Sequence, residues 1–219
     1  MRFHFGDLNP PLVPPDEEEG WTRISGPRSA SAHLLAWLIG IGLFLAMMVA
    51  LIFASFMATS ASGAKGTAPP PPTPTPWFAM AATLLLSVPA HELLHALFQP
   101  DFGLSPSTIL VMWPRRLRFG IFFEGSMARG HWLVMRMAPF VILCLLPTLL
   151  LILVMGKPLD FTVETCLTLL ILVNSLGSGG DLLAAAWVAS HIPRGSTLAF
   201  LAGRAYWRLG SEDAASPAN

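Results

Sequence analysis

Two histidines and a glutamate stand inside an apolar stretch, PAHELLHALF, at residues 89–98. His91 and His95 are four residues apart, so on a helix both imidazoles lie on one face and can reach the same metal ion. Glu92 follows the first histidine, where its carboxylate can act as a general base towards a water molecule at the metal. The pattern His-Glu-x-x-His therefore indicates zinc-dependent hydrolysis. The alternative is a pair of core histidines that hold no metal.

A catalytic zinc ion needs a third protein ligand, and Asp181 is the candidate. If a membrane helix begins at residue 77, His91 and His95 lie about 21–27 Å along it. A later helix that begins at residue 163 and runs in the same direction places Asp181 about 27 Å from its start. All three side chains are therefore predicted at one membrane depth. The alternative role for Asp181 is helix packing through hydrogen bonds to serines.

The segment NSLGSGGDLL, residues 174–183, surrounds this aspartate. Asn174, Ser178 and Asp181 are spaced by four and three residues, so a helix presents them as one polar stripe. Asn174, with Ser178 beside it, is a candidate to hold a substrate carbonyl or an oxyanion. A straight helix would leave Asn174 about 10 Å from Asp181, and the alternative role for Asn174 is a hydrogen bond between helices. The glycines allow a close helix neighbour or local unwinding.

The elements that must hold these residues are membrane helices. Of the 219 residues, 53% are hydrophobic and 12% are charged, against about 25% charged in ordinary soluble domains. A bilayer-spanning helix needs roughly 20 mostly apolar residues. Four segments meet that requirement, and they predict an all-α membrane protein with four transmembrane helices at residues 32–58, 77–98, 131–155 and 163–192.

Basic residues are distributed unevenly among the predicted loops. Ten arginines lie before the first span, between the second and third spans or after the fourth, whereas two lysines lie in the other two loops. The positive-inside rule then predicts that both termini are cytoplasmic. Arg136, five residues into the third span, is expected to extend its side chain to the membrane interface.

The segments outside the spans are predicted to differ in character. Residues 1–31 mix proline, glycine and charge, and we expect a mobile cytoplasmic tail; residues 68–76 are expected to form an extended polyproline II connector. STILVMW and LRFGIFFE, between the second and third spans, predict a hairpin-like pair of strands at the cytoplasmic interface. Residues 32–192 would then form one membrane domain, and 193–219 a short cytoplasmic segment with one further short element.

A His-Glu-x-x-His motif in one membrane helix, followed in a later helix by an asparagine, a glycine-rich stretch and an aspartate, resembles the site-2 protease type of intramembrane metalloprotease. The resemblance is closer to small bacterial proteins of unknown function that are catalogued as putative zincin peptidases. It runs from about residue 77 to residue 192 and includes Ala138-Pro139-Phe140 in the third span.

The resemblance implies a multi-pass protein of the bacterial cytoplasmic membrane, with Glu92 as the general base and with zinc ligands at His91, His95 and Asp181. The sequence departs from site-2 proteases, which usually carry Asn-Pro and Asp-Gly, because Ser175 and Leu182 follow the asparagine and the aspartate.

The predicted function is a Zn²⁺-dependent intramembrane peptidase that cuts membrane-embedded or membrane-adjacent substrates near the cytoplasmic face. The expected partners are the lipid bilayer and a membrane-protein or peptide substrate, with no nucleic acid. Strands within residues 108–124 are expected to capture an extended substrate by β-augmentation. The alternative is a non-catalytic membrane protein whose metal or polar site serves helix packing, sensing or scaffolding.

Overall fold

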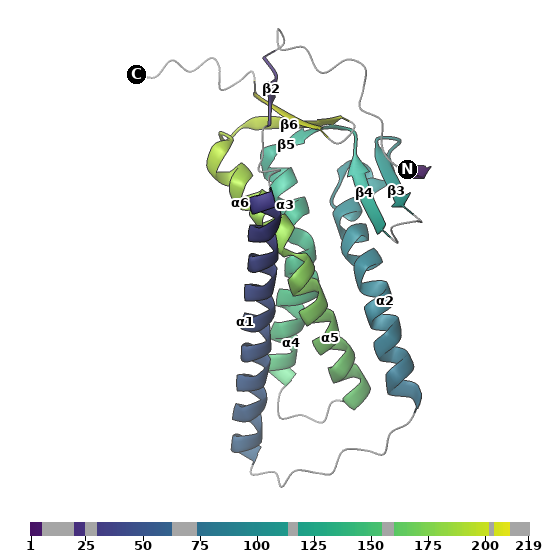
Figure 1. The fold of residues 1–219 in the computed structure, drawn as a ribbon, viewed down its shortest axis with the longest axis vertical. Coiled ribbons are helices and arrows are strands. Elements are labelled where there is room, and N and C mark those ends of the chain that lie inside the picture. Colours follow the sequence, from purple (N-terminus) through teal and green to yellow (C-terminus); the bar gives the residue numbers. More distant parts are fainter. Residues whose placement is uncertain are drawn as a thin grey trace. The chain divides into compact units, whose positions relative to one another are not determined.

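The computed structural model describes residues 1–5, 20–24, 30–62, 74–113, 118–154, 160–201 and 204–210. Helices dominate these residues, and two β-sheets accompany them (Figure 1). The chain divides into two compact units, which are described separately. Unit one comprises Met1–Ala32, Glu92–Ala138 and Asp181–Asn219, and unit two comprises His33–His91 and Pro139–Gly180.

Among the described residues, three helices are long and apolar enough to cross a membrane. They begin and end within α1 (Ala30–Ser62), α2 (Pro74–Leu97) and the continuous run Arg129–Val154. That run consists of α3 (Arg129–Phe140), a π-helical turn (η4, Val141–Leu145) and α4 (Leu146–Val154). Their length and composition support the prediction of a membrane protein.

The fourth predicted span is two helices instead of one. α5 (Phe161–Gly177) and α6 (Gly179–His191) are bent by 48° at the break between them, and they satisfy the length test only as a pair. The break falls in the glycine-rich stretch at which the sequence allows local unwinding, because glycine is a weak helix former. The protein has four candidate spans if α5 and α6 cross the membrane together, and three if they do not. The predicted number of four spans therefore stays a prediction.

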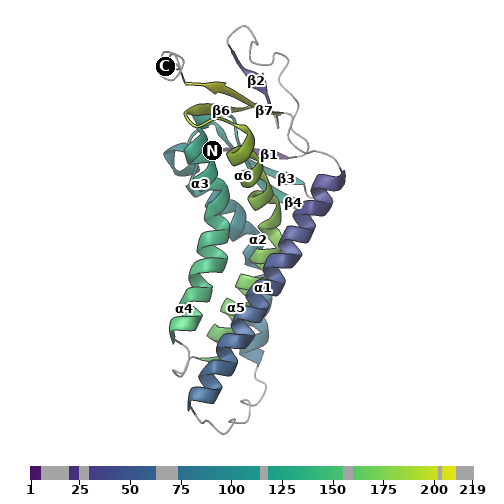
Figure 2. The same ribbon diagram turned by 90° about the vertical axis from the view of Figure 1, so that its left-hand side faces the viewer.

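In unit two, α1, α4 and α5 lie side by side (Figures 1 and 2). Leu51, Leu151 and Ile171, one from each helix, form a buried cluster. Asp160 caps the start of α5, and its Oδ1 accepts the backbone N–H groups of Thr162 at 2.9 Å and Val163 at 3.2 Å. This capping satisfies two donors that the first turn of a helix would otherwise leave without a partner.

Unit one contains two β-sheets. The first has the order β1-β3-β4, where β1 (Arg2–Phe5) is parallel and β4 (Arg118–Phe123) antiparallel to β3 (Thr108–Trp113). The second is antiparallel and has the order β2-β7-β6-β5: β2 (Thr22–Arg23), β7 (Arg204–Leu209), β6 (Ser196–Leu201) and β5 (Gly125–Ala128). A 3-10 turn, η2 (Pro100–Gly103), follows α2. The buried core of this unit comprises Met127, Trp132, Met135, Val188, Ile192 and Leu198.

The sheets correct the all-α prediction. The two strands predicted in residues 108–124 are present as the antiparallel pair β3 and β4, whereas their placement at the cytoplasmic interface stays a prediction. The short C-terminal element is the β6–β7 pair. The predicted tail also supplies β1 and β2, which pair with strands about 100 and 180 residues away, a separation that short-range patterns do not encode. Residues 6–19 and 25–29 of the tail, the proline-rich connector up to residue 73 and residues 114–117 lie outside the described residues. The end of the predicted connector, residues 74–76, is helical and opens α2, since proline is tolerated in the first turn of a helix.

Candidate metal centre

The candidate centre is built on α2, whose buried side is polar. Ser87 (2% exposed), His91 (9%) and His95 (6%) are buried at every fourth position, and Gln99 (4%) continues the row just after the helix. Ala96 (4%) is buried beside them, whereas the apolar Leu85 and Leu93 are 76% and 50% exposed. This is the reverse of an amphipathic helix in a soluble protein. It suits a helix in lipid, where apolar side chains face hydrocarbon and polar groups need partners inside the protein.

His91, His95 and Asp181 form the one group of possible metal ligands found among the described residues. One ligand atom from each lies within 4.8 Å of the others. The two histidines are one turn apart on α2, and Asp181 lies in the first turn of α6. Ligands about 2.0–2.1 Å from a tetrahedral zinc ion are about 3.3 Å apart, so small side-chain shifts would bring these three atoms to that spacing. The sequence prediction that Asp181 accompanies the two histidines is thus supported by their proximity.

The imidazole of His95 has a defined orientation. Its Nδ1 donates to the backbone carbonyl of Met135 at 3.0 Å, and its Nε2 lies 3.1 Å from Oδ2 of Asp181. Because a carbonyl can only accept, the proton of the neutral ring belongs on Nδ1 and Nε2 carries a lone pair. Nε2 and the carboxylate oxygen then face each other as two acceptors, which requires an added proton or a cation between them.

His91 is oriented in the same way by Asn174. Nδ1 of His91 lies 3.2 Å from Oδ1 of Asn174, and the amide nitrogen of Asn174 donates to the carbonyl of Leu170 at 2.9 Å. Since the amide nitrogen is engaged there, the amide oxygen accepts the Nδ1 proton of His91, and Nε2 is the ring atom with a lone pair for a metal. Hydrogen bonding of the second imidazole nitrogen is typical of histidines that bind metals.

The residues predicted to contact a substrate have other partners here. Asn174 is 3% exposed and contacts His91, while the hydroxyl of Ser178 is fully buried and donates to the carbonyl of Asn174 at 2.7 Å. Their predicted role at an oxyanion stays a prediction. Asn174 is brought to the candidate centre, but as a neighbour of a ligand.

Arg136 is the residue whose partner the sequence analysis missed. Its Nη1 donates to Oδ1 of Asp181 at 2.7 Å, and its guanidinium carbon lies 5.3 Å from the centre of the Trp132 ring. The side chain is 36% exposed, so it does not simply extend into solvent. The sequence carries one signal for this pair: an arginine within an apolar span is costly, which favours pairing with a carboxylate at a similar membrane depth.

Glu92 contacts the edge of the first sheet. Its Oε2 accepts the backbone N–H of Ile121, in β4, at 3.1 Å. Ile121 is paired with Leu110 of β3, and β4 is the last strand in its sheet. The Ile121 N–H therefore points away from β3, and the Glu92 carboxylate lies at the outer edge of β4.

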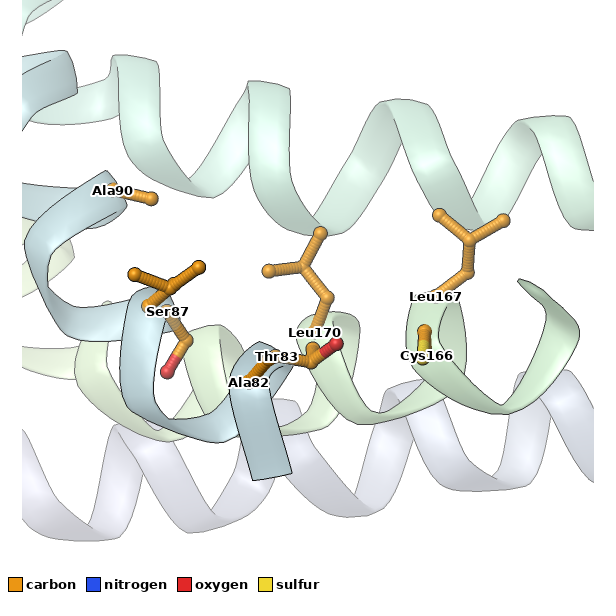
Figure 3. Close-up of a pocket in the computed structure, with 8 residues that line it drawn as sticks. Ala82, Thr83, Ser87, Ala90, Cys166, Leu167 and Leu170 are labelled. Atoms are coloured by element: carbon orange, nitrogen blue, oxygen red, sulfur yellow. The ribbon is translucent and has the colours of Figure 1, made fainter. Parts of the chain in front are cut away.

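An apolar groove of about 300 Å³ lies between α2 and α5 in unit two (Figure 3). Small side chains account for much of its lining, and it reaches Ala90, the residue before His91. The lining residues are Ala82, Thr83, Leu86, Ser87, Ala90, Cys166, Leu167 and Leu170. The groove therefore leads along α2 to the start of the motif.

The candidate centre lies in a part of the chain that resembles known proteins. The model of a family described as "Putative zincin peptidase" matches residues 84–197, which is more than half of the 219 residues. The matched range contains the two motif histidines, Glu92, Arg136 and Asp181. No curated protein and no solved structure matches the chain. The chain therefore belongs to the family of putative zincin peptidases.

Proposed function

We propose that this protein is a zinc-dependent intramembrane peptidase that hydrolyses membrane-embedded or membrane-adjacent substrates near the cytoplasmic face. The observation that carries the proposal is the pair formed by Nε2 of His95 and Oδ2 of Asp181, which are 3.1 Å apart while the Nδ1 proton is committed to Met135. Two facing acceptors of this kind, with the His91 imidazole within 4.8 Å, fit a cation bound by nitrogen and oxygen ligands.

His91, His95 and Asp181 would hold the zinc ion. When bound there, zinc supplies Lewis acidity, which polarises a peptide carbonyl and makes a water molecule a stronger acid. Two neutral imidazoles and one carboxylate are a ligand set found in catalytic zinc sites, which leave a fourth position for water or substrate.

Glu92 is the general base in this proposal. It follows His91 on α2, so its carboxylate is carried by the same helix as two of the ligands. It would take a proton from the attacking water molecule and pass it to the amine of the leaving peptide. Its contact with the Ile121 N–H would hold the carboxylate beside the edge of β4.

The proposed substrate binds in an extended conformation along β4. A peptide in a helix has its carbonyls engaged in hydrogen bonds, so it must unwind before hydrolysis. The outer edge of β4 offers backbone groups to a new strand at every second residue, and the Ile121 N–H on this edge holds Glu92 beside the incoming strand.

The test compares wild-type protein with Glu92→Gln, each purified in detergent at full length. We expect about one zinc ion per chain in both, because Glu92 is not one of the three proposed ligands. We expect cleavage of membrane peptides by the variant to fall by about 10²–10⁴-fold, which is the usual contribution of a general base. Unaltered cleavage with unaltered zinc content would exclude the catalytic role of Glu92.

A non-catalytic role is the second candidate, and one observation favours it. Arg136 already pairs with Asp181, and the three candidate ligands are 6–9% exposed, so a doubly protonated His95 could complete the cluster without a metal. This candidate predicts purified protein that lacks zinc, or that binds zinc and cleaves no membrane peptide. Zinc lost on replacing His91, His95 or Asp181, together with cleavage that depends on Glu92, would exclude it.

A further inference from the structure

One turn of α3 supplies a hydrogen-bond partner to each of two candidate ligands. The Met135 carbonyl accepts the Nδ1 proton of His95 at 3.0 Å, and Nη1 of Arg136 donates to Oδ1 of Asp181 at 2.7 Å. Both partners are consecutive residues of α3, and all four groups lie within unit one. A single short segment therefore contacts ligands from two other helices, α2 and α6.

Pro139 explains how a carbonyl inside a helix becomes available. In an α-helix the carbonyl of one residue accepts the N–H of the residue four positions later, so the Met135 carbonyl would pair with residue 139. Proline has no N–H, and Pro139 lies inside α3. The Met135 carbonyl therefore lacks its usual helical donor and accepts from His95 instead.

We propose that Pro139 and Arg136 are positioning residues for the metal centre. Pro139 keeps the Met135 carbonyl available, which orients the His95 ring with Nε2 towards Asp181. Arg136 occupies Oδ1 of Asp181, which leaves Oδ2 at 3.1 Å from Nε2. This inference rests on the proposed zinc site and identifies the residues that direct two of its ligand atoms to one point.

Two other hydrogen bonds of α3 involve no candidate ligand, and the one made by Arg129 provides a control. His131 donates from Nε2 to the Phe98 carbonyl at 2.6 Å, and Arg129 donates from Nη2 to the Ala189 carbonyl at 2.8 Å. These bonds connect α3 to the end of α2 and to α6, but neither involves a candidate ligand. A variant at Arg129 therefore loosens the same helices without releasing Asp181.

The first experiment replaces Pro139 by Ala in the full-length protein. The new N–H competes with His95 for the Met135 carbonyl, so we expect zinc affinity, measured by competition with a chromophoric chelator, to fall about 10–100-fold. The melting temperature of the metal-free protein should stay equal or rise, because a proline leaves a helix interior. A fall in zinc affinity without a fall in melting temperature excludes a simple folding defect. Pro147→Ala, in α4 of the same run, should leave zinc affinity unchanged.

The second experiment replaces Arg136 by Gln. The positive charge of Arg136 repels a bound cation, so electrostatic repulsion alone predicts tighter zinc binding in the uncharged variant. Positioning predicts the reverse, a loss of about 10–100-fold. Arg136→Lys, which keeps a charged donor, should restore part of the affinity, and Arg129→Gln should match wild type. The absorption spectrum of bound Co²⁺ should change in Pro139→Ala and Arg136→Gln. It should stay the same in the controls Pro147→Ala and Arg129→Gln.

The outcomes separate this inference from the function on which it rests. Wild-type protein that binds no zinc would overturn both. Zinc binding by wild type, with equal affinity and an equal Co²⁺ spectrum in Pro139→Ala and Arg136→Gln, would overturn the positioning roles alone. Tighter zinc binding by Arg136→Gln would exclude a positioning role for Arg136, since repulsion between its charge and the zinc ion would then be its main effect on binding.

Discussion

At the scale of single residues, each imidazole of the motif has a hydrogen-bond acceptor at Nδ1. Asn174 accepts from His91 and the Met135 carbonyl accepts from His95. The two acceptors differ in kind, because one is a side chain that mutation can remove and the other belongs to the backbone. Asn174 is therefore the residue at which the orientation of a histidine can be tested directly.

We expect Asn174→Ala to weaken zinc binding by about 10–100-fold, because His91 loses the acceptor that fixes its ring. Chelator competition measures the affinity. Ser175→Ala is the matched control, since the Ser175 hydroxyl is buried and donates to the Ile171 carbonyl at 2.7 Å. Unchanged zinc affinity with reduced cleavage would instead support the predicted role of Asn174 at a substrate carbonyl.

At the scale of elements, the edge of β4 and the base proposed for catalysis meet at one backbone N–H. Ile121 can be replaced by Pro without removing a bond to β3, because its N–H points to Glu92. We expect Ile121→Pro to retain zinc and to lose most cleavage of extended substrates, since the contact with Glu92 disappears and the proline disturbs the edge on which a substrate strand would pair.

Ile121→Val is the control for this experiment, because it keeps the N–H and a β-branched side chain. Zinc content and cleavage should both match wild type. Cleavage by the proline variant at the wild-type rate, with zinc still bound, would show that the edge of β4 captures no substrate.

The packing of α1 against α5 in unit two gives a second prediction at this scale. A Cβ at Gly40 would overlap the Leu176 carbonyl, whereas a Cβ at Gly42 would meet nothing within 4 Å. We expect Gly40→Ala to destabilise the protein by about 1–3 kcal/mol, as overpacking usually does. Gly42→Ala should leave the melting temperature in detergent equal or slightly higher. Equal melting temperatures for the two variants would contradict the close approach.

At the scale of the whole molecule, the number of spans decides where the C-terminus lies. Ten arginines against two lysines predict a cytoplasmic N-terminus. If α5 and α6 cross the membrane as one bent span, the chain has four spans and its C-terminus is also cytoplasmic; otherwise it has three and the C-terminus is outside.

A topology reporter fused after Gly210 measures this directly, with a second reporter at the N-terminus as reference. We expect both reporters to give the cytoplasmic signal. Opposite signals from the two ends would mean three spans and a C-terminus outside. The same fusions test whether β6 and β7, which precede the C-terminal reporter, lie on the cytoplasmic side.

The sequence by itself determined the features that depend on spacing within one element. Four-residue spacing places His91 and His95 on one helix face, long apolar runs predict the membrane helices, and β-branched stretches predict β3 and β4. The predicted membrane depth of Asp181 matches that of the two histidines, which made it the candidate for the third ligand. Each of these features is local, or follows from the fixed thickness of a bilayer.

Only the tertiary structure decided which groups complete the candidate centre. The Met135 carbonyl, Arg136 and Asn174 reach their ligands across 40, 45 and 83 residues of chain. The pairing of β1 with β3 had no signal in the sequence, and the glycines allowed a break between α5 and α6 without fixing its angle. Helix periodicity fixes which residues of one element share a face, whereas contacts between elements depend on how side chains pack, and that packing has no short-range signal.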